Sequence, residues 1–292
     1  MTGARAGHLA MLCFSMLVAG SFALGSLAAN EISPSALNTV RFWIATIIIG
    51  AAAFGTSGLS RASLRAPWRY PLLAALLMSY FVLMFEGLKT APPVSLAAVF
   101  TLTPILTAGF GWLLLRQVLS GRMALALLIG ALGALWVIFR ADVAAVLRFE
   151  LGRGEFVYFW GCVAHAAYTP LVRKLNHGET AVVFSFGILL SGSILLTVWG
   201  WRDLTTTDWT ALPVIVWVTI LYTAVFASAA TFVLLQFAAM QLPSSKVMAY
   251  TYLTPSWVIV WELALGGTPP PLFIMLGLLL TVTALVLLLR ED

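Results

Sequence analysis

Hydrophobic residues fill long uncharged runs of this chain, and charged residues are confined to short intervals between them. The uncharged runs include residues 6–30, 42–60, 90–115, 180–201, 209–245 and 263–289. About 20 consecutive apolar residues in a helix span the hydrocarbon core of a bilayer, and clusters of Gly and Pro divide the longer runs. The pattern predicts ten membrane-spanning helices, near residues 8–28, 36–56, 70–89, 92–114, 121–139, 154–173, 179–200, 211–236, 243–265 and 271–289.

Composition indicates the same class of protein. With 61% hydrophobic and 9% charged residues, the chain lacks the roughly one quarter of charged residues that a soluble domain has. We therefore expect an all-α integral membrane protein with the lipid bilayer as a partner. The net charge of +5 does not indicate a nucleic-acid partner, because the basic residues are scattered among loops. The sequence leaves the oligomeric state open, and a monomer is compatible with it.

The positions of the basic residues predict the topology. If the N-terminus is cytoplasmic, ten of the sixteen basic residues fall on the inner side and six on the outer side, where acidic residues also collect. Cytoplasmic loops carry an excess of Lys and Arg, so we expect both termini in the cytoplasm. The first apolar segment also fits a cleavable signal peptide. We interpret it as a helix, because its removal would break the pairing of the two halves described next.

A short sequence occurs once in each half of the chain. Residues 102–104 and 253–255 both read Leu-Thr-Pro, and another proline, Pro92 or Pro243, lies twelve residues before the proline of each copy. The copies are 151 residues apart in a chain of 292. Matching motifs in corresponding apolar segments are typical of a duplicated membrane protein.

The duplication predicts two five-helix repeats, residues 1–140 and 154–292. Because five is an odd number, the second repeat enters the membrane from the opposite side, so the repeats are inverted. Inverted repeats give inward-open and outward-open states of similar energy, which is the basis of alternating access in secondary transporters.

The repeated prolines are candidates for a helix kink or a gate. Pro104 and Pro255 lack a backbone N–H, so the carbonyl groups of Phe100 and Thr251 lose their helical partners. Such carbonyl groups must be satisfied by protein, water or a substrate. The alternative to a role in the pathway is an ordinary kink repaired by neighbouring hydroxyl groups, for which four residues are close enough: Thr101, Thr103, Thr251 and Thr254.

Deep aromatic and polar side chains are the candidate binding residues. Tyr250, Thr254, Trp257 and Trp261 recur at i, i+4, i+7 and i+11 on one helical face, although Trp261 also fits an interfacial anchor. Flat apolar walls with a few polar groups suit an aromatic amino acid. The predicted substrate-binding set is Phe22, Tyr80, Phe100, Thr103, Trp160, His165, Tyr168, Tyr222, Tyr250, Tyr252, Thr254 and Trp257.

Ionisable residues at depth are few. His165 lies near the middle of its helix, where it would either contact a substrate or be a neutral histidine bonded to a neighbouring helix. Glu86 and Lys89 are spaced to form a local i,i+3 pair. Arg41 and Glu262 lie toward the predicted outer helix ends, where snorkelling or mutual pairing explains them. No carboxylate is expected near the midplane to bind a coupling ion.

Cofactor and metal chemistry are not expected. The chain has three histidines and two cysteines, and Cys13 and Cys162 fall inside predicted spans. A Gly-Lys-Ser/Thr phosphate-binding loop and a His-Glu-x-x-His motif are both missing from the sequence. We therefore expect neither ATP-driven transport nor an intramembrane enzyme, which remains the alternative from another class.

These motifs resemble the drug/metabolite transporter superfamily, built from five-helix domains of the EamA type. The matching elements are Ala19-Gly20-Ser21-Phe22, Arg41-Phe42, Gly87-Leu88 with Pro92, Pro104, Gly130 with Gly133, His165 to Tyr168, Pro243, Pro255 and Gly277. Arg116-Gln117 and Gly266-Gly267 stand where most members have Gly-Glu, so this chain has no glutamate at either position. The chain is most similar to YddG-type exporters of aromatic amino acids, and this resemblance implies a bacterial inner-membrane exporter with a central cavity.

The leading hypothesis is a secondary transporter that exports amino acids, aromatic and other neutral ones, and related metabolites. A multidrug exporter of lipophilic cations is the alternative, because aromatic walls also suit such cations. That alternative would require a membrane-embedded Glu, and the first predicted helix has none.

Overall fold

The computed structural model describes residues 3–56, 65–140, 142, 144–145 and 151–289, and that part of the chain is helical, without strands. Within these described residues, ten helical segments follow the predicted spans, which confirms the fold class. The first half contains α1 (Gly3–Ala28), α2 (Pro34–Thr56), α3 (Arg69–Leu88), α4 (Pro93–Phe100) with α5 (Thr103–Leu115), and α6 (Gly121–Ile138). The second half contains α8 (Arg153–Leu175), α9 (Ala181–Trp199), α11 (Val214–Ala224) with the π-helix η2 (Val225–Ala230) and α12 (Thr231–Gln241), α13 (Ser244–Ala249) with the 3₁₀-helix η3 (Tyr250–Leu253) and α14 (Thr254–Ala264), and α15 (Leu272–Leu289).

Eight segments in the described part of the chain are long and apolar enough to cross a membrane. Two of the ten helical segments are exceptions and are not among these eight. One is the segment from α13 to α14, which is interrupted by η3. The other exception, α8, has 23 residues but carries buried polar groups such as His165 and Thr169. It packs against α3, α4 and α5, so protein and not lipid covers much of its polar surface. A further short helix, α10 (Trp201–Thr206), was not predicted from the sequence.

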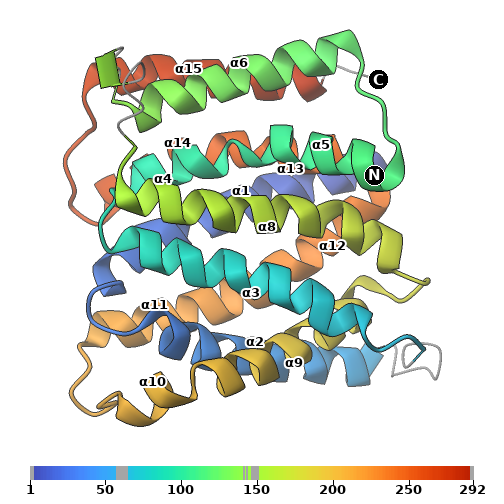
Figure 1. Cartoon of the computed structure of the whole chain (residues 1–292), viewed down its shortest axis with the longest axis vertical. Coiled ribbons are helices and arrows are strands. Elements are labelled where there is room, and N and C mark those ends of the chain that lie inside the picture. Colours follow the sequence, from blue (N-terminus) through green and yellow to red (C-terminus); the bar gives the residue numbers. More distant parts are fainter. Residues whose placement is uncertain (1–2, 57–64, 141, 143, 146–150, 290–292) are drawn as a thin grey trace.

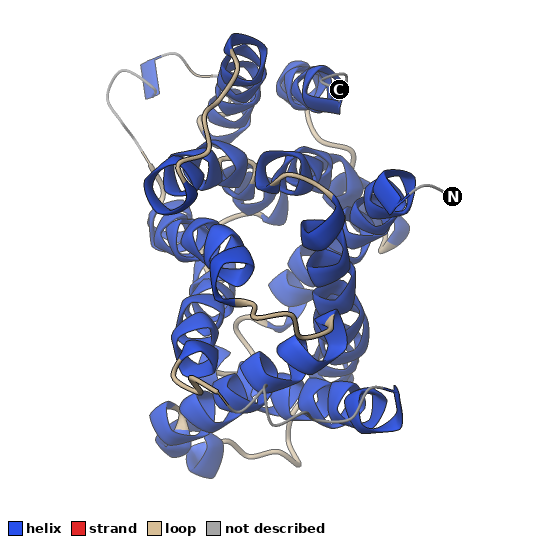
Figure 2. Ribbon diagram, turned by 90° about the vertical axis from the view of Figure 1, so that its right-hand side faces the viewer, coloured by secondary structure: helices blue, strands red, loops and turns tan. Residues whose placement is uncertain are grey.

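The helix contacts show how the two halves are related. The corresponding pairs α2 with α9 and α6 with α15 pack on each other, and the α3–α8 contact has its counterpart in α12 with α1. The α5–α8 contact likewise corresponds to α14 with α1. Figure 1 shows α6 and α15 at one end of the long axis, α2 and α9 toward the other, and both termini on the same side of the molecule; Figure 2 views the bundle after a quarter turn.

Two pairs of glycines let helices from opposite halves approach closely. A Cβ on Gly87 of α3 would lie 2.8 Å from the carbonyl oxygen of Gly154 in α8. A Cβ on Gly133 of α6 would lie 2.7 Å from the carbonyl oxygen of Gly277 in α15. Small residues at such crossings permit backbone contact, which is the usual basis of helix packing in membranes.

The two repeated prolines follow interruptions in their helices. Pro104 lies at the start of α5 and Pro255 at the start of α14. The Phe100 carbonyl accepts a hydrogen bond of 2.5 Å from Thr103 Oγ1, and the Thr251 carbonyl accepts one from the backbone N–H of Thr254. Both carbonyl groups that lack an ordinary helical partner are therefore satisfied within the protein in this conformation.

Candidate functional site

Aromatic rings from four helices meet in the middle of the molecule. The ring centre of Tyr80 (α3) lies 4.5 Å from that of His165 (α8) and 5.6 Å from that of Phe100 (α4). Phe22 (α1) lies 6.0 Å from Phe100, and Tyr168 lies one helical turn after His165 at 6.0 Å. These five residues, all predicted from the sequence, are brought together by the crossing of α1, α3, α4 and α8.

Tyr158 belongs to the same cluster, although the sequence analysis did not select it. Its hydroxyl donates a 3.1 Å hydrogen bond to Tyr80, and its ring lies 5.9 Å from Phe22. The available signal was periodicity, because Tyr158 precedes His165 by seven residues and shares its helical face. Further along α8, Gln236 Nε2 of α12 donates to the Tyr168 hydroxyl at 3.4 Å. The cluster therefore contains a row of polar groups within apolar surroundings: the side chains of Tyr158, Tyr80, His165, Tyr168 and Gln236.

A small cavity of about 10 Å³ lies beside this row of polar groups. That is about the room one water molecule needs, so the site is closed in this conformation. Ser21 Oγ and His165 Nδ1 are buried and have no hydrogen-bond partner among the described residues. The lining comprises Phe14, Val18, Ser21, Leu77, Tyr80, Phe81, Met84, His165, Ala227, Thr231, Phe232 and Leu235.

Larger grooves open toward the two ends of the bundle. The termini-side groove, of about 370 Å³, has a mixed polar and apolar lining that includes Arg173, Asn176 and Gln236. The opposite-side groove, of about 260 Å³, includes Glu86, Lys89 and Arg153. Since Gln236 also bonds Tyr168, the termini-side groove reaches the edge of the aromatic cluster.

The predicted aromatic face of residues 243–265 packs against α1, away from the central cavity of this conformation. Tyr250 O–H and His8 Nδ1 are hydrogen-bonded at 3.1 Å. Trp261 Nε1 donates to the carbonyl of Met16 at 3.4 Å, and Trp257 lies in a groove that Met16 also lines. The i, i+4, i+7 spacing identifies a common face, but it does not say which neighbouring helix covers that face.

Further predicted residues lie outside both the aromatic cluster and the cavity lining. Tyr222 O–H donates to the Leu17 carbonyl at 3.0 Å. Tyr252 packs on Gly130 of α6, and the hydroxyl groups of Tyr252 and Thr254 are buried without a partner in the described part. Trp160 is 54% exposed on the outer surface of α8. Depth in the membrane gave no information on its direction around the helix axis.

The interpretation of Arg41 as a snorkelling or Glu262-paired residue is wrong. Its side chain is fully buried and donates to Ser228 Oγ at 2.7 Å and to the Ala227 carbonyl at 3.1 Å. Both acceptors lie in η2, which packs on α2. By contrast, the predicted local pair of Glu86 and Lys89 is confirmed at 2.7 Å.

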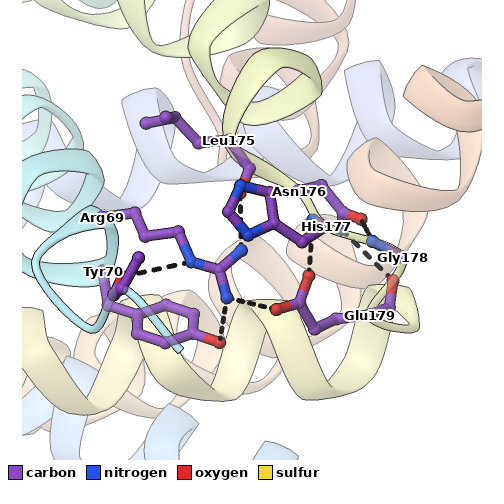
Figure 3. Close-up of polar contacts among 8 residues, drawn as sticks. Arg69, Tyr70, Leu175, Asn176, His177, Gly178 and Glu179 are labelled. Atoms are coloured by element: carbon purple, nitrogen blue, oxygen red, sulfur yellow. Dashed lines mark hydrogen bonds and ion pairs between the residues drawn. The ribbon is translucent and has the colours of Figure 1, made fainter. Parts of the chain in front are cut away.

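A buried ion pair lies on the termini side of the bundle (Figure 3). Arg69, at the start of α3, contacts the Glu179 carboxylate and donates to the Leu175 carbonyl at 2.6 Å. Burial alone would raise the pKa of Glu179. Hydrogen bonds from Arg69 and from the His177 backbone outweigh that effect and hold this pKa below its usual value. The contact ties the first half of the chain to the loop before α9.

Comparisons with known proteins cover nearly the whole chain. The model of the EamA-like transporter family matches residues 5–139 and 152–290. The Uncharacterized transporter YyaM of Bacillus subtilis (strain 168) is 24% identical over 277 residues, which are 94% of this chain and 90% of that protein. A solved crystal structure is similar with a TM-score of 0.73 and 19% identity, covering 98% of this chain and 96% of its own. At that identity, the structural likeness concerns the fold alone.

Proposed function

The chain belongs to the EamA-like transporter family, and from this premise we propose that it exports amino acids, aromatic and other neutral ones, and related metabolites. The proposed location is a bacterial inner membrane with both termini in the cytoplasm. The two halves, residues 1–140 and 154–292, would exchange conformations to give alternating access. We propose a small-molecule substrate and no catalytic chemistry.

The main support is the pair of unpartnered polar atoms in the aromatic cavity. Ser21 Oγ and His165 Nδ1 are buried, and a buried polar group without a hydrogen bond costs about 1–3 kcal/mol. A solute that brings its own polar groups would remove that cost. Tyr80 and Phe100 supply flat surfaces beside them, as an aromatic side chain requires.

The present conformation fits an occluded state without substrate. The cavity of about 10 Å³ is too small for an amino acid, while grooves of about 370 Å³ and 260 Å³ lie toward the two ends. Admission of a solute would therefore require the helices around the cluster to separate. The helix interruptions before Pro104 and Pro255 are proposed hinges for this movement.

Transport by purified protein in liposomes tests the proposal. We expect uptake of labelled phenylalanine or tryptophan above that of empty liposomes, and lower flux for His165→Ala and Tyr80→Ala. Phe156→Ala is the matched control, because Phe156 lies on the outer surface of the same α8 helix. Flux equal to empty liposomes for every amino acid would overturn the amino-acid assignment. Repeating the assay with a pH gradient distinguishes proton coupling from facilitated diffusion.

A further inference from the structure

Arg41 places a positive charge in the middle of the protein. Its exposed fraction is 0%, and its acceptors are Ser228 Oγ, the Ala227 carbonyl and, at 3.4 Å, Asn38 Oδ1. A guanidinium has five N–H donors. Three acceptors therefore leave two N–H groups without an acceptor in the described part of the chain.

The local backbone is built around this side chain. Ala227 and Ser228 lie within the π-helix η2, a rare, wider turn that is frequently found at functional sites. In an α-helix the Thr231 N–H would bond to the Ala227 carbonyl, but here it is directed to Phe226 and Ser228. The Ala227 carbonyl instead accepts from the guanidinium.

No carboxylate balances the charge of Arg41 among the described residues. Four of the described acids that are buried or partly buried have other partners: Glu86 bonds Lys89, Glu155 bonds Ser95, Glu179 bonds Arg69 and Asp203 bonds Ser35. The fifth, Glu262, is partly buried and forms no ion pair with Arg41. An arginine stays protonated in proteins, and a buried charge without a counter-charge costs several kcal/mol. Helix packing alone explains the hydrogen bonds of Arg41 but does not require its charge.

The guanidinium lies directly behind the wall of the central cavity. Its Cζ atom is 4.0 Å from the ring centre of Phe81, and both Phe81 and Ala227 line the cavity. The same lining contains the unpartnered Ser21 and His165 atoms. The face of an aromatic ring attracts a cation, so Phe81 covers the charge of Arg41 in this conformation.

We propose that Arg41 is the counter-charge for the carboxylate of the transported solute. The inference rests on the proposed function, because it takes the central cavity as the substrate site. Rotation of Phe81 would expose the two free N–H groups, while Ser21 and His165 contact the remaining polar groups of the solute. The chain would then select solutes with a carboxylate and discriminate against lipophilic cations.

Competition in liposomes containing the wild-type protein tests this selection without any mutation. Unlabelled 3-phenylpropionate has the carboxylate but no ammonium group, and phenylalaninamide has the ammonium but no carboxylate. We expect the first to inhibit uptake of labelled L-phenylalanine and the second to inhibit at least about tenfold more weakly, as the loss of a charge-assisted hydrogen bond implies. Equal inhibition by both compounds would overturn the role of Arg41. Absence of phenylalanine uptake would overturn the proposed function for this substrate and the inference with it.

Three variants separate the charge from the packing role. Arg41→Gln removes the charge and should raise KM for phenylalanine about tenfold or more, while Arg41→Lys should retain part of the affinity. Ser228→Ala removes the 2.7 Å hydrogen bond but keeps the charge, so it should preserve the preference for 3-phenylpropionate over phenylalaninamide. If Arg41→Gln transports phenylalanine with unchanged KM, Arg41 only joins α2 to η2 and the inference fails while the transporter assignment stands. If that variant does not fold, the competition result with wild-type protein decides.

Discussion

Tyr158 donates a 3.1 Å hydrogen bond to Tyr80, and both hydroxyl groups are buried where α8 crosses α3. The contact links a residue of the second half to one of the first. It also holds the Tyr80 ring within 4.5 Å of the His165 ring. This hydrogen bond therefore fixes the positions of the aromatic rings where the two halves cross in the closed conformation.

Removal of this hydrogen bond should weaken transport. In Tyr158→Phe the Tyr80 hydroxyl loses its partner, and a neutral buried hydrogen bond contributes about 0.5–1.5 kcal/mol. We expect phenylalanine flux in liposomes to fall about 2- to 10-fold, with the protein still folded. The control is Phe159→Leu, which changes a ring on the same helix that packs against Trp160. Unchanged flux in Tyr158→Phe would remove the tyrosine pair from the transport mechanism.

The Arg69–Glu179 ion pair should make stability depend on pH. The pKa of Glu179 is lower in the folded state than its ordinary value, so the unfolded chain takes up the proton first as the pH falls. The stabilisation is fully present above the unfolded pKa of about 4.3 and is lost as the pH falls through the folded pKa. We expect Tm to fall across that window by more in the wild type than in Glu179→Gln.

A matched pair elsewhere provides the control for this pH effect. Glu86 and Lys89 also form an ion pair, but their side chains are 39% and 30% exposed. Exposed pairs contribute about 0–1 kcal/mol, so Glu86→Gln should leave the pH dependence of Tm as in the wild type. Identical Tm profiles for wild type and Glu179→Gln would contradict a stabilising role for the buried pair.

The contact of α6 with α15 should not tolerate a side chain at Gly133. A Cβ there would lie 2.7 Å from the Gly277 carbonyl oxygen, so Gly133→Ala must push the two helices apart. Nothing lies within 4 Å of a Cβ at Gly109 in α5, and Gly109→Ala should be neutral or slightly stabilising because Ala favours helix. Thermal unfolding of the two variants in the same detergent measures the difference. A Tm for Gly133→Ala at or above that of Gly109→Ala would contradict the close packing.

The helices and the repeat could be predicted from the sequence, because both produce patterns that extend over many residues. Runs of apolar residues locate spans whatever surrounds them, and the Glu86–Lys89 pair depends only on local spacing. The direction of a side chain in an apolar helix was harder to predict. Trp160 and His165 lie on the same helix, yet the first is 54% exposed and the second is buried. When lipid and protein interior are both apolar, hydrophobicity does not distinguish the two faces.

Arg41 illustrates the other limit. Its position toward a predicted helix end favoured a snorkelling interpretation, because long cationic side chains usually reach the interface there. The structure instead buries it against η2. The residue that contacts this π-helix is far away in the sequence, since Arg41 and Ser228 are 187 residues apart. No local sequence pattern in residues 225–230 predicts this π-helix.

The two Leu-Thr-Pro copies should respond differently to the same substitution. Thr103 Oγ1 donates a 2.5 Å hydrogen bond to the Phe100 carbonyl, whereas Thr254 Oγ1 has no partner among the described residues. Thr103→Val therefore leaves a buried carbonyl group without this donor and should cost about 1–2 kcal/mol. Thr254→Val replaces an unpartnered hydroxyl with a methyl group and should be neutral or stabilising. Each variant is the other's control, because the positions correspond in the repeat. Equal losses of Tm would indicate that Thr254 bonds a group in solution that this conformation does not show, and would contradict the asymmetry between the two copies.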